Sequence, residues 1–196
     1  MHTVWLYAGV LGYLLGSVPF GYLLGRLRGV DVRRHGSGAT GATNVARTLG
    51  LGPALLTVAL DALKGFLAAY LGLRLGGEWG YAAAGLGAVL GHSWPAWLGF
   101  RGGKSVATGA GALLVLHPAA VGVAVLVAAA FIVPTRYVSL GSIAGTLALA
   151  SWIAATAPLP HKLTAAIAGA IVLWRHRGNV QRLLAGTERR FGERAA

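Results

Sequence analysis

The sequence predicts an all-α membrane protein, a polytopic bundle of about seven transmembrane helices with its N-terminus outside and its C-terminus in the cytoplasm. Of the 196 residues, 56% are hydrophobic and only 11% are charged, whereas roughly 25% of the residues in a soluble domain are charged. The apolar residues form long runs, each close to the ~20 residues that cross a bilayer as a helix. The 31 glycines are typical of helices that pack closely in lipid.

Six apolar runs alternate with polar segments, and the fourth run is long enough to form two helices. The runs cover residues 4–24, 51–75, 79–98, 105–133, 137–157 and 161–174. The segments at residues 25–50 and 99–104 are polar and rich in glycine, and a basic tail closes the chain. Because no repeat, linker or second domain interrupts this pattern, we expect residues 1–196 to form a single integral membrane domain.

The distribution of Lys and Arg favours seven helices over six, because these residues collect in cytoplasmic loops. With a break at His117–Pro118, seven helices leave only Arg74 and Lys162 as basic residues on the outer face. Six helices would move Arg136 and the whole basic tail to that face. The proline also favours a break, since it disfavours helical backbone at the preceding residue. All polar, glycine-rich segments then lie on the cytoplasmic face, where they can form one site.

This topology also explains the net charge of +12, so we expect membrane lipid around the chain, no nucleic acid and no obligate protein partner. The absence of cysteine excludes disulfides, thiolate catalysis and cysteine-ligated metals. Nothing in the sequence indicates a metal or a redox cofactor. Asp61 and Lys64, inside the second run, are interpreted as an internal ion pair, because ionisable groups are costly in a membrane. A role in aligning the site is the alternative.

The first polar segment, residues 36–47, has the composition of an anion-binding loop. Its glycines allow backbone N–H groups to face an anion. Ser37, Thr43 and Asn44 offer neutral hydrogen bonds, and Arg47 offers a bidentate contact to phosphate. A flexible surface loop with turn residues is the alternative interpretation.

The second segment, residues 91–105, superficially resembles a nucleotide-binding P-loop. Gly99 lies one position too late for that motif and no strand is expected before it, so nucleotide hydrolysis is excluded. Glycine amides and Lys104 can still face an anion at the start of a helix. His92 ends the preceding helix, and a structural role for this histidine weighs evenly against a role in the site.

Two further segments add polar side chains at helix ends. Ser139 and Ser142 lie one helical turn apart after Arg136, and His176 and Asn179 lie in a basic segment near the C-terminus. Serines that bond their own helix backbone and a basic tail attracted to anionic lipid are the alternative interpretations.

Together, the four segments resemble the bacterial acyl-phosphate:glycerol-3-phosphate acyltransferase family of integral membrane enzymes, over nearly the whole chain. The resemblance rests on residues 36–50, 92–108, 136–142 and 175–191. It implies transfer of a fatty acyl group from acyl phosphate to the 1-hydroxyl of sn-glycerol 3-phosphate. Lysophosphatidate and phosphate are the implied products, in the first acylation step of bacterial phospholipid biosynthesis. The implied location is the bacterial inner (plasma) membrane, with the active site at its cytoplasmic face.

The resemblance also implies roles for individual residues. The implied catalytic residues are His176, Asn179 and Lys104. Those implied to bind glycerol 3-phosphate are Ser37, Arg47, Lys104, His176 and Asn179. Those implied to lie at the acyl-phosphate head are Thr43, Asn44, Ser142 and His92. Three positions depart from the family pattern, none of them in a main role: Ala39, Arg101 and Ser105.

The residue types suit this chemistry independently of the resemblance. Acyl phosphate carries a good leaving group, so the protein needs two neighbouring phosphate sites and charge stabilisation at the carbonyl oxygen rather than a strong nucleophile. The hydroxyl proton can go to His176 or to the donor's own phosphate, and the shortage of carboxylates favours the phosphate.

Two other functions stay open at this point. A transporter or channel for a phosphorylated solute would use the same anion-binding loops, although transporter sites usually lie near the membrane midplane between inverted repeats. A structural membrane subunit would use the loops to bind lipid headgroups or a partner.

Overall fold

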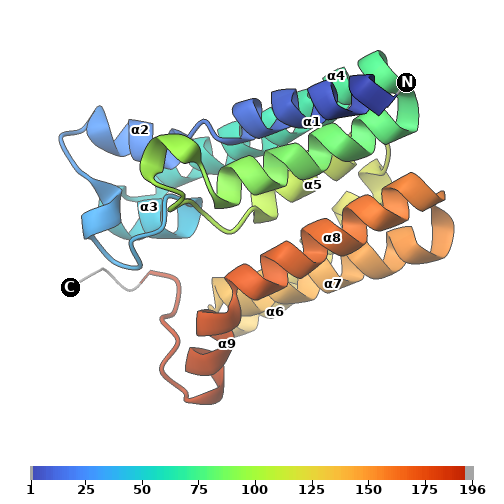
Figure 1. Cartoon of the computed structure of the whole chain (residues 1–196). Helices are drawn as coiled ribbons and strands as arrows, with labels where there is room; N and C mark the ends of the chain where they lie inside the picture. The colour runs from blue at the N-terminus through green and yellow to red at the C-terminus, as the bar shows by residue number, and fades with distance from the viewer. Residues whose placement is uncertain (1, 193–196) are drawn as a thin grey trace.

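The computed structural model describes residues 2–192, and this part of the chain is helical without any strand. The helices of the bundle are α1 (His2–Gly16), α4 (Leu51–Ser93), α5 (Val106–Leu114), α6 (Pro118–Thr135), α7 (Val138–Thr156) and α8 (Leu159–Arg175). Helix α4 turns back on itself at Gly76 and Gly77, where Gly77 has a φ of 62°. The two arms of α4 and the five other helices make the predicted all-α bundle of about seven segments (Figure 1).

Only some of these helices are long enough to cross a bilayer. Four segments of the described residues are long and apolar enough to cross a bilayer, namely 3–26, 51–98, 118–135 and 138–156, and the second of these contains both arms of α4. Helix α5 has 9 residues, which reach only about 14 Å into a hydrocarbon core of ~30 Å. The predicted break at His117–Pro118 is therefore confirmed, but the helices that it separates are unequal in length.

Two predicted helices, those over residues 4–24 and 79–98, are shorter than expected because a proline interrupts each apolar run. Proline has no N–H to continue a helix, and it disfavours helical backbone at the residue before it. Pro19 separates α1 from a further short helix, and α4 ends two residues before Pro95. The prediction of one continuous helix over each of these runs was wrong.

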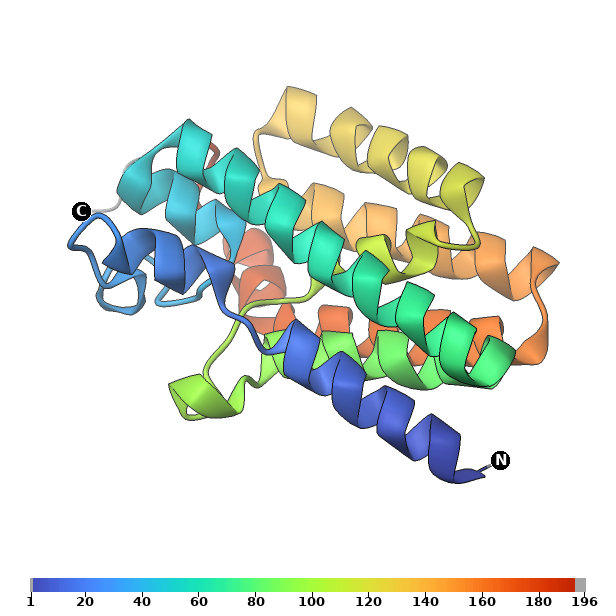
Figure 2. The same ribbon diagram turned by 90° about the horizontal axis from the view of Figure 1, so that it is seen from above.

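Glycine permits the closest helix contacts in the bundle, as the composition predicted. A Cβ added at Gly12 of α1 would lie 2.1 Å from the carbonyl oxygen of Ala84, and one added at Gly87 would lie 2.2 Å from that of Gly9. The backbones of α1 and the second arm of α4 are thus in direct contact (Figure 2). Small residues allow this approach, which supplies packing energy where lipid provides no hydrophobic driving force.

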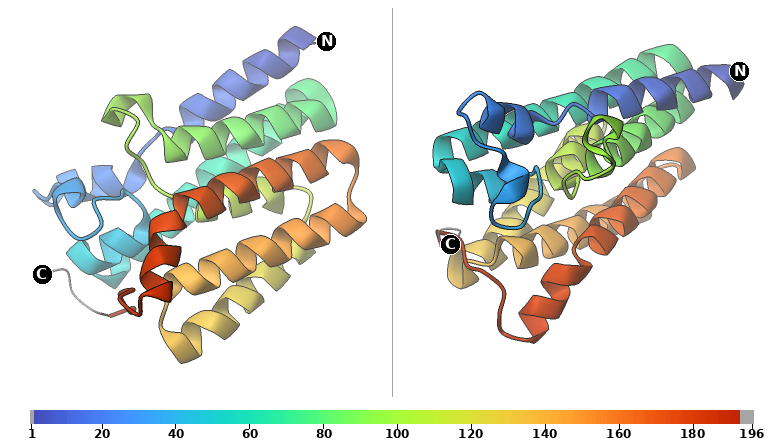
Figure 3. Two further views of the ribbon diagram at one scale, coloured as in Figure 1. Left: turned by 60° about the horizontal axis from the view of Figure 1, so that its bottom comes forward. Right: turned by 60° about the vertical axis from the view of Figure 1, so that its left-hand side comes forward.

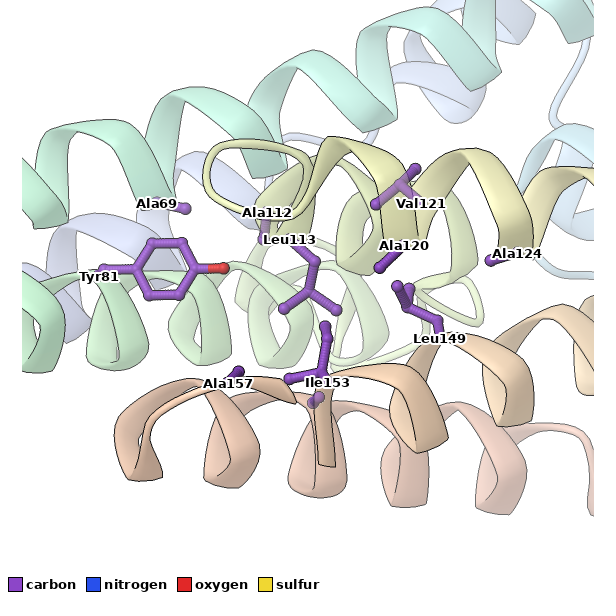
Figure 4. Packing of buried hydrophobic residues seen from close by; sticks show 11 residues of the cluster. Ala69, Tyr81, Ala112, Leu113, Ala120, Val121, Ala124, Leu149, Ile153 and Ala157 are labelled. Carbon is purple, nitrogen blue, oxygen red and sulfur yellow. The ribbon is translucent and has the colours of Figure 1, made fainter. Parts of the chain in front are cut away.

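A buried cluster joins two groups of helices, one formed by α1, α4 and α5 and the other by α6, α7 and α8 (Figure 1). Tyr81 of α4 and Leu113 of α5 meet Val121 of α6 and Ile153 of α7 in this cluster (Figure 4). The cluster fixes the position of one group relative to the other. That relation matters for a site whose residues come from both groups.

The short helices gather at one end of the bundle. They are α2 (Phe20–Arg26), η1 (Val32–Arg34), α3 (Ala42–Leu49), η2 (Ala96–Leu98) and α9 (Arg177–Leu184). Figure 3 shows α2 and α3, which precede α4 in the chain, and α9, which follows α8, at this same end. The predicted convergence of the polar segments on one face is confirmed, whereas the side of the membrane on which this face lies stays a prediction.

The contact between α4 and α5 gives a test of the glycine packing. A Cβ at Gly111 would lie 2.0 Å from the carbonyl oxygen of Ala62, whereas a Cβ at Gly122 of α6 would meet nothing within 4 Å. Gly111→Ala should destabilise the fold by about 1–3 kcal/mol through overpacking, and Gly122→Ala should leave it unchanged. Thermal unfolding in detergent measures both. Equal unfolding midpoints for the two variants would contradict this account of the helix contact.

Candidate active site

A glycine-rich loop between η2 and α5 carries Lys104 to the polar end of the bundle. The loop lies directly on His92: a Cβ added at Gly103 would be 2.1 Å from His92 Nε2, and one added at Gly102 would be 2.1 Å from its carbonyl oxygen. The Gly103 N–H donates to that carbonyl at 3.0 Å. Only glycine fits these two positions, so the composition of the loop follows from its closeness to α4.

Lys104 contacts the other group of helices through Asn179. Its Nζ donates to Asn179 Oδ1 at 2.5 Å, and Asn179 Nδ2 donates to Glu188 Oε1 at 2.6 Å. Glu188 also accepts from Ser139 Oγ at 2.8 Å and from Arg182 Nε at 2.8 Å. A hydrogen-bonded chain therefore runs from the glycine loop through α9 to α7, and both oxygens of its carboxylate are used.

Glu188 is a site residue to which the sequence assigned no role. Its burial raises the pKa of its carboxyl, but hydrogen bonds from Asn179, Ser139 and Arg182 outweigh burial and leave the pKa below its ordinary value. The available signals were its place among the residues that carry the family resemblance and its acidic charge in a basic tail. The contacts with Ser139 and Asn179 depend on the tertiary fold, so the sequence alone gave no partner for it.

Arg136 fixes the segment that follows Glu188. It donates to the carbonyl oxygen of Phe191 at 3.1 Å from Nε and 2.6 Å from Nη2. Its own carbonyl accepts from the Phe191 N–H at 2.7 Å. A structural contact thus explains Arg136 without a lipid phosphate.

Positive charge surrounds Lys104. Burial is the main reason that its pKa falls to about 8; the charge of Glu188 opposes this shift, while those of Arg182, Arg47 and Arg175 add to it. Four cations and one carboxylate therefore lie close together, an arrangement suited to a doubly charged anion.

His176 lies at the junction of α8 and α9, and only 2% of it is exposed. Its Nδ1 donates to the carbonyl oxygen of Val172 at 2.8 Å, which leaves Nε2 as an acceptor in the neutral ring. Burial, followed by the charge of Lys104, lowers the pKa of His176 to about 4. His176 is therefore neutral at pH 7, and its Nε2 can accept a hydrogen bond from a hydroxyl.

Asn44 of α3 faces its own loop. Its Nδ2 donates to the carbonyl oxygens of Val32, His35 and Ala39 at 2.8, 3.1 and 2.9 Å, and its Oδ1 accepts from the Ser37 N–H at 2.9 Å. The side chain is 2% exposed. This amide shapes the loop, so the expected contact of the Asn44 side chain with an acyl-phosphate head has no support in this geometry.

The other residues predicted in the first segment lie at the surface of the polar end. Ser37 is exposed, while Thr43 and Arg47 are half-buried on α3, four residues apart and so on one side of the helix. Arg47 Nη2 donates to the carbonyl oxygen of Arg189 at 3.5 Å. The Arg47 side chain therefore reaches from α3 to the C-terminal segment, and it lies close enough to Lys104 to lower the pKa of that lysine.

His92 lies beneath the glycine loop and is only 7% exposed. Its Nδ1 is 3.5 Å from Asp61 Oδ1, and Asp61 pairs with Lys64 Nζ at 2.8 Å. Lys64 also donates to the carbonyl oxygen of Val18 at 2.7 Å, a group left without a helical partner near Pro19. The predicted internal ion pair of Asp61 and Lys64 is confirmed. These contacts are those of a structural histidine, and a role of His92 in the site stays a prediction.

An apolar groove begins beside the glycine loop and runs between α5, α7 and α8. The volume that the centre of a water-sized molecule can occupy in it is about 30 Å³. Two of its lining residues are close to the site in the sequence: Ser105 follows Lys104, and Val172 comes four residues before His176. The remaining lining residues are mostly small or aliphatic: Val106, Gly109, Ala110, Leu113, Thr146, Leu149, Ala150, Ala165, Ala168 and Gly169. Ser142, predicted near the acyl phosphate, is half-buried one turn before Thr146 on α7.

A family model described as glycerol-3-phosphate acyltransferase matches residues 6–186. The chain belongs to the glycerol-3-phosphate acyltransferase family. The family prediction from the sequence is confirmed. The four segments that carried the resemblance are those that the fold brings to one end of the bundle.

Several members of this family are similar to this chain along almost their whole length. The glycerol-3-phosphate acyltransferase of Symbiobacterium thermophilum is 56% identical over 187 residues, which cover 95% of this chain and 94% of that protein. That of Gloeobacter violaceus is 50% identical over 195 residues, covering 94% and 93%. The crystal structure of PlsY, an integral membrane glycerol 3-phosphate acyltransferase, in its glycerol 3-phosphate form has a TM-score of 0.92 and 41% identity over 96% of both chains.

Glu188 gives a test of the hydrogen-bonded chain. Glu188→Gln removes the charge that Arg182 pairs with and replaces one acceptor oxygen by a donor, so Asn179 loses its fixed orientation toward Lys104. Hydrogen bonds to a charged group contribute about 1.5–3 kcal/mol, which predicts a fall of about 10- to 100-fold in kcat/KM for the acyltransferase reaction. Glu78→Gln, at the opposite end of the bundle, is the control. An unchanged kcat/KM in Glu188→Gln would contradict the role of this chain.

Proposed function

We propose that this protein transfers a fatty acyl group from acyl phosphate to the 1-hydroxyl of sn-glycerol 3-phosphate, giving lysophosphatidate and inorganic phosphate. This proposal is supported by a cluster of cations around Lys104, Asn179 and His176, next to an apolar groove whose lining includes Ser105 and Val172. This combination suits a phosphorylated polar acceptor and a long acyl chain in the same reaction. Similar proteins carry the name glycerol-3-phosphate acyltransferase, and a second PlsY structure is described as its lysophosphatidic acid form.

Glycerol 3-phosphate binds with its phosphate on the cationic side of the cluster in this proposal. Lys104 and Arg47 are the charged ligands, with Ser37 as a neutral one. Asn179 and His176 orient the hydroxyl groups, since His176 Nε2 is free to accept and Asn179 already lies against Lys104. Because two cations and a neutral imidazole serve different parts of one substrate, the acceptor is held in a single orientation.

Acyl phosphate binds with its chain in the groove between α5, α7 and α8 in this proposal. The groove is lined by small and aliphatic residues of α5, α7 and α8, which suits an apolar chain that enters from lipid. Thr43 and Ser142 are the proposed contacts of the phosphate head. Asn44 and His92 act on it indirectly, through the loops that they fix.

The reaction needs charge stabilisation more than a protein nucleophile. The 1-hydroxyl oxygen attacks the acyl carbon, the bond from that carbon to the phosphate oxygen breaks, and the cations stabilise the negative charge on the carbonyl oxygen and the leaving phosphate. The hydroxyl proton goes to the leaving phosphate. A histidine with a pKa of about 4 is a weak base at pH 7, which supports the donor phosphate as the acceptor of that proton.

The proposed location is the bacterial inner membrane, with the site at the cytoplasmic face and the N-terminus outside. The Arg-rich and Lys-rich segments at the polar end of the bundle support this orientation. The acceptor is a charged, water-soluble molecule, so its site belongs at a membrane surface rather than at the midplane.

A phosphate-release assay tests the function. The purified protein in lipid receives acyl phosphate with or without glycerol 3-phosphate, and we expect phosphate release that depends on the acceptor. Uptake of the solute into vesicles without acylated product would indicate a transporter and overturn the proposal. His176→Ala in the same assay tests the proton acceptor: retained slow turnover supports the donor phosphate, whereas near-complete loss with normal substrate binding assigns the proton to the histidine.

The pKa of Lys104 predicts how acceptor binding depends on pH. With a pKa of about 8 in the free protein, Lys104 carries its charge below that pH and loses it above. Because a phosphate monoester is fully ionised from about pH 7 upward, KM for glycerol 3-phosphate should rise as pH increases from 7.5 to 9.5. Lys104→Arg does not titrate in this range, so its KM should stay constant. A pH-independent KM in the unmodified protein would contradict the assignment.

A further inference from the structure

Arg175 contacts the glycine loop from the opposite group of helices. It is the last residue of α8, and its Nε donates to the carbonyl oxygen of Gly103 at 2.9 Å. Its Nη2 donates to the carbonyl oxygen of Gly102 at 3.1 Å. The guanidinium carbon also lies 5.6 Å from the ring centre of Trp94. One planar side chain thus contacts two successive carbonyls while an aromatic ring limits its movement.

These contacts determine the orientation of two peptide groups. In a planar trans peptide, the carbonyl and the following N–H point in opposite directions. The Gly102–Gly103 peptide is therefore held from both edges, because its carbonyl accepts from Arg175 while its N–H donates to the His92 carbonyl. In the next peptide, Arg175 holds the Gly103 carbonyl, so the Lys104 N–H points away from the guanidinium.

The loop needs such contacts because glycine does not restrict its own backbone. Gly102 and Gly103 have no side chains to pack, and glycine loses more conformational freedom on ordering than any other residue. Lys104 follows directly, and its Nζ must reach Asn179 on α9. A rotation of either glycine peptide would move Lys104 away from Asn179.

We propose that Arg175 is a positioning residue, whose two donors fix the Gly102 and Gly103 peptides so that Lys104 and its backbone N–H face the phosphate of the acceptor. The inference rests on the proposed function for the identity of that acceptor. Arg175 acts through the loop and not through its charge alone. A lysine at this position therefore cannot replace it, because a lysine lacks the planar pair of donors.

Two variants and one control test this role. Arg175→Lys should weaken binding of glycerol 3-phosphate about tenfold, with kcat at saturation changed less than about threefold, because the interaction is made equally in the ground and transition states. Arg175→Ala should weaken binding more, and added methylguanidinium should partly restore it. The control is Arg177→Lys, since Arg177 is an exposed neighbour that packs on Trp174 at 4.0 Å. It should match the unmodified protein.

Calorimetric binding of glycerol 3-phosphate without acyl phosphate keeps this inference separate from the proposed function. Unmodified protein that binds glycerol 3-phosphate but transfers no acyl group would overturn the function alone. Wild-type affinity in Arg175→Lys would overturn the positioning role, because charge would then suffice. Failure of methylguanidinium to restore binding in a folded Arg175→Ala would also overturn it.

Discussion

The hydrogen bond between Lys104 and Asn179 joins the two groups of helices, together with the apolar cluster and the contacts of Arg175 with the glycine loop. Lys104 comes from the loop before α5, and Asn179 comes from α9 after α8. A half-buried ammonium group is costly unless hydrogen bonds and an opposite charge compensate for lost water. Glu188 supplies that charge through Asn179, and Ser139 and Arg182 fix the carboxylate. The site therefore exists only when both groups are in place.

A bilayer around the bundle explains why its polar segments gather at one end. Within the hydrocarbon core, unpaired charge and unsatisfied backbone are costly. The bundle meets this constraint with small residues at helix contacts and with the Asp61–Lys64 pair, whose Lys64 also donates to the carbonyl oxygen of Val18. Polar loops are permitted only at the membrane surface. The proposed function uses the apolar groove between α5, α7 and α8 for the donor chain and the polar end of the bundle for the charged acceptor.

Features that follow from local rules could be predicted from the sequence. Pro118 breaks the fourth apolar run, and the glycines permit close helix packing. The distribution of arginine and lysine indicated that the four polar segments lie on one face. Proline interrupts the helices at Pro19 and Pro95 for the same reason. These breaks were not predicted, because each proline lies within an apolar run of ~20 residues, which is the length of a spanning helix.

The contacts that the sequence did not predict join residues far apart in the chain. Ser139 is 49 residues from Glu188, and Arg175 is 72 residues from Gly103. No periodicity or spacing indicates such pairs. Asn44 is the opposite case, because the sequence predicted a ligand contact that the structure does not show. Its glycine-rich loop has the composition of an anion site, yet the four hydrogen bonds of the Asn44 side chain are all made to the backbone of this loop.

Polar segments from both groups of helices should lie at one and the same membrane surface. The chain has no cysteine, so single cysteines at the exposed positions Ser37, Arg101, Arg189 and Glu78 can be labelled in sealed vesicles with an impermeant maleimide. We expect the first three to react from one side of the membrane and Glu78 to react from the other. Labelling of Ser37, Arg101 and Arg189 from different sides would contradict it.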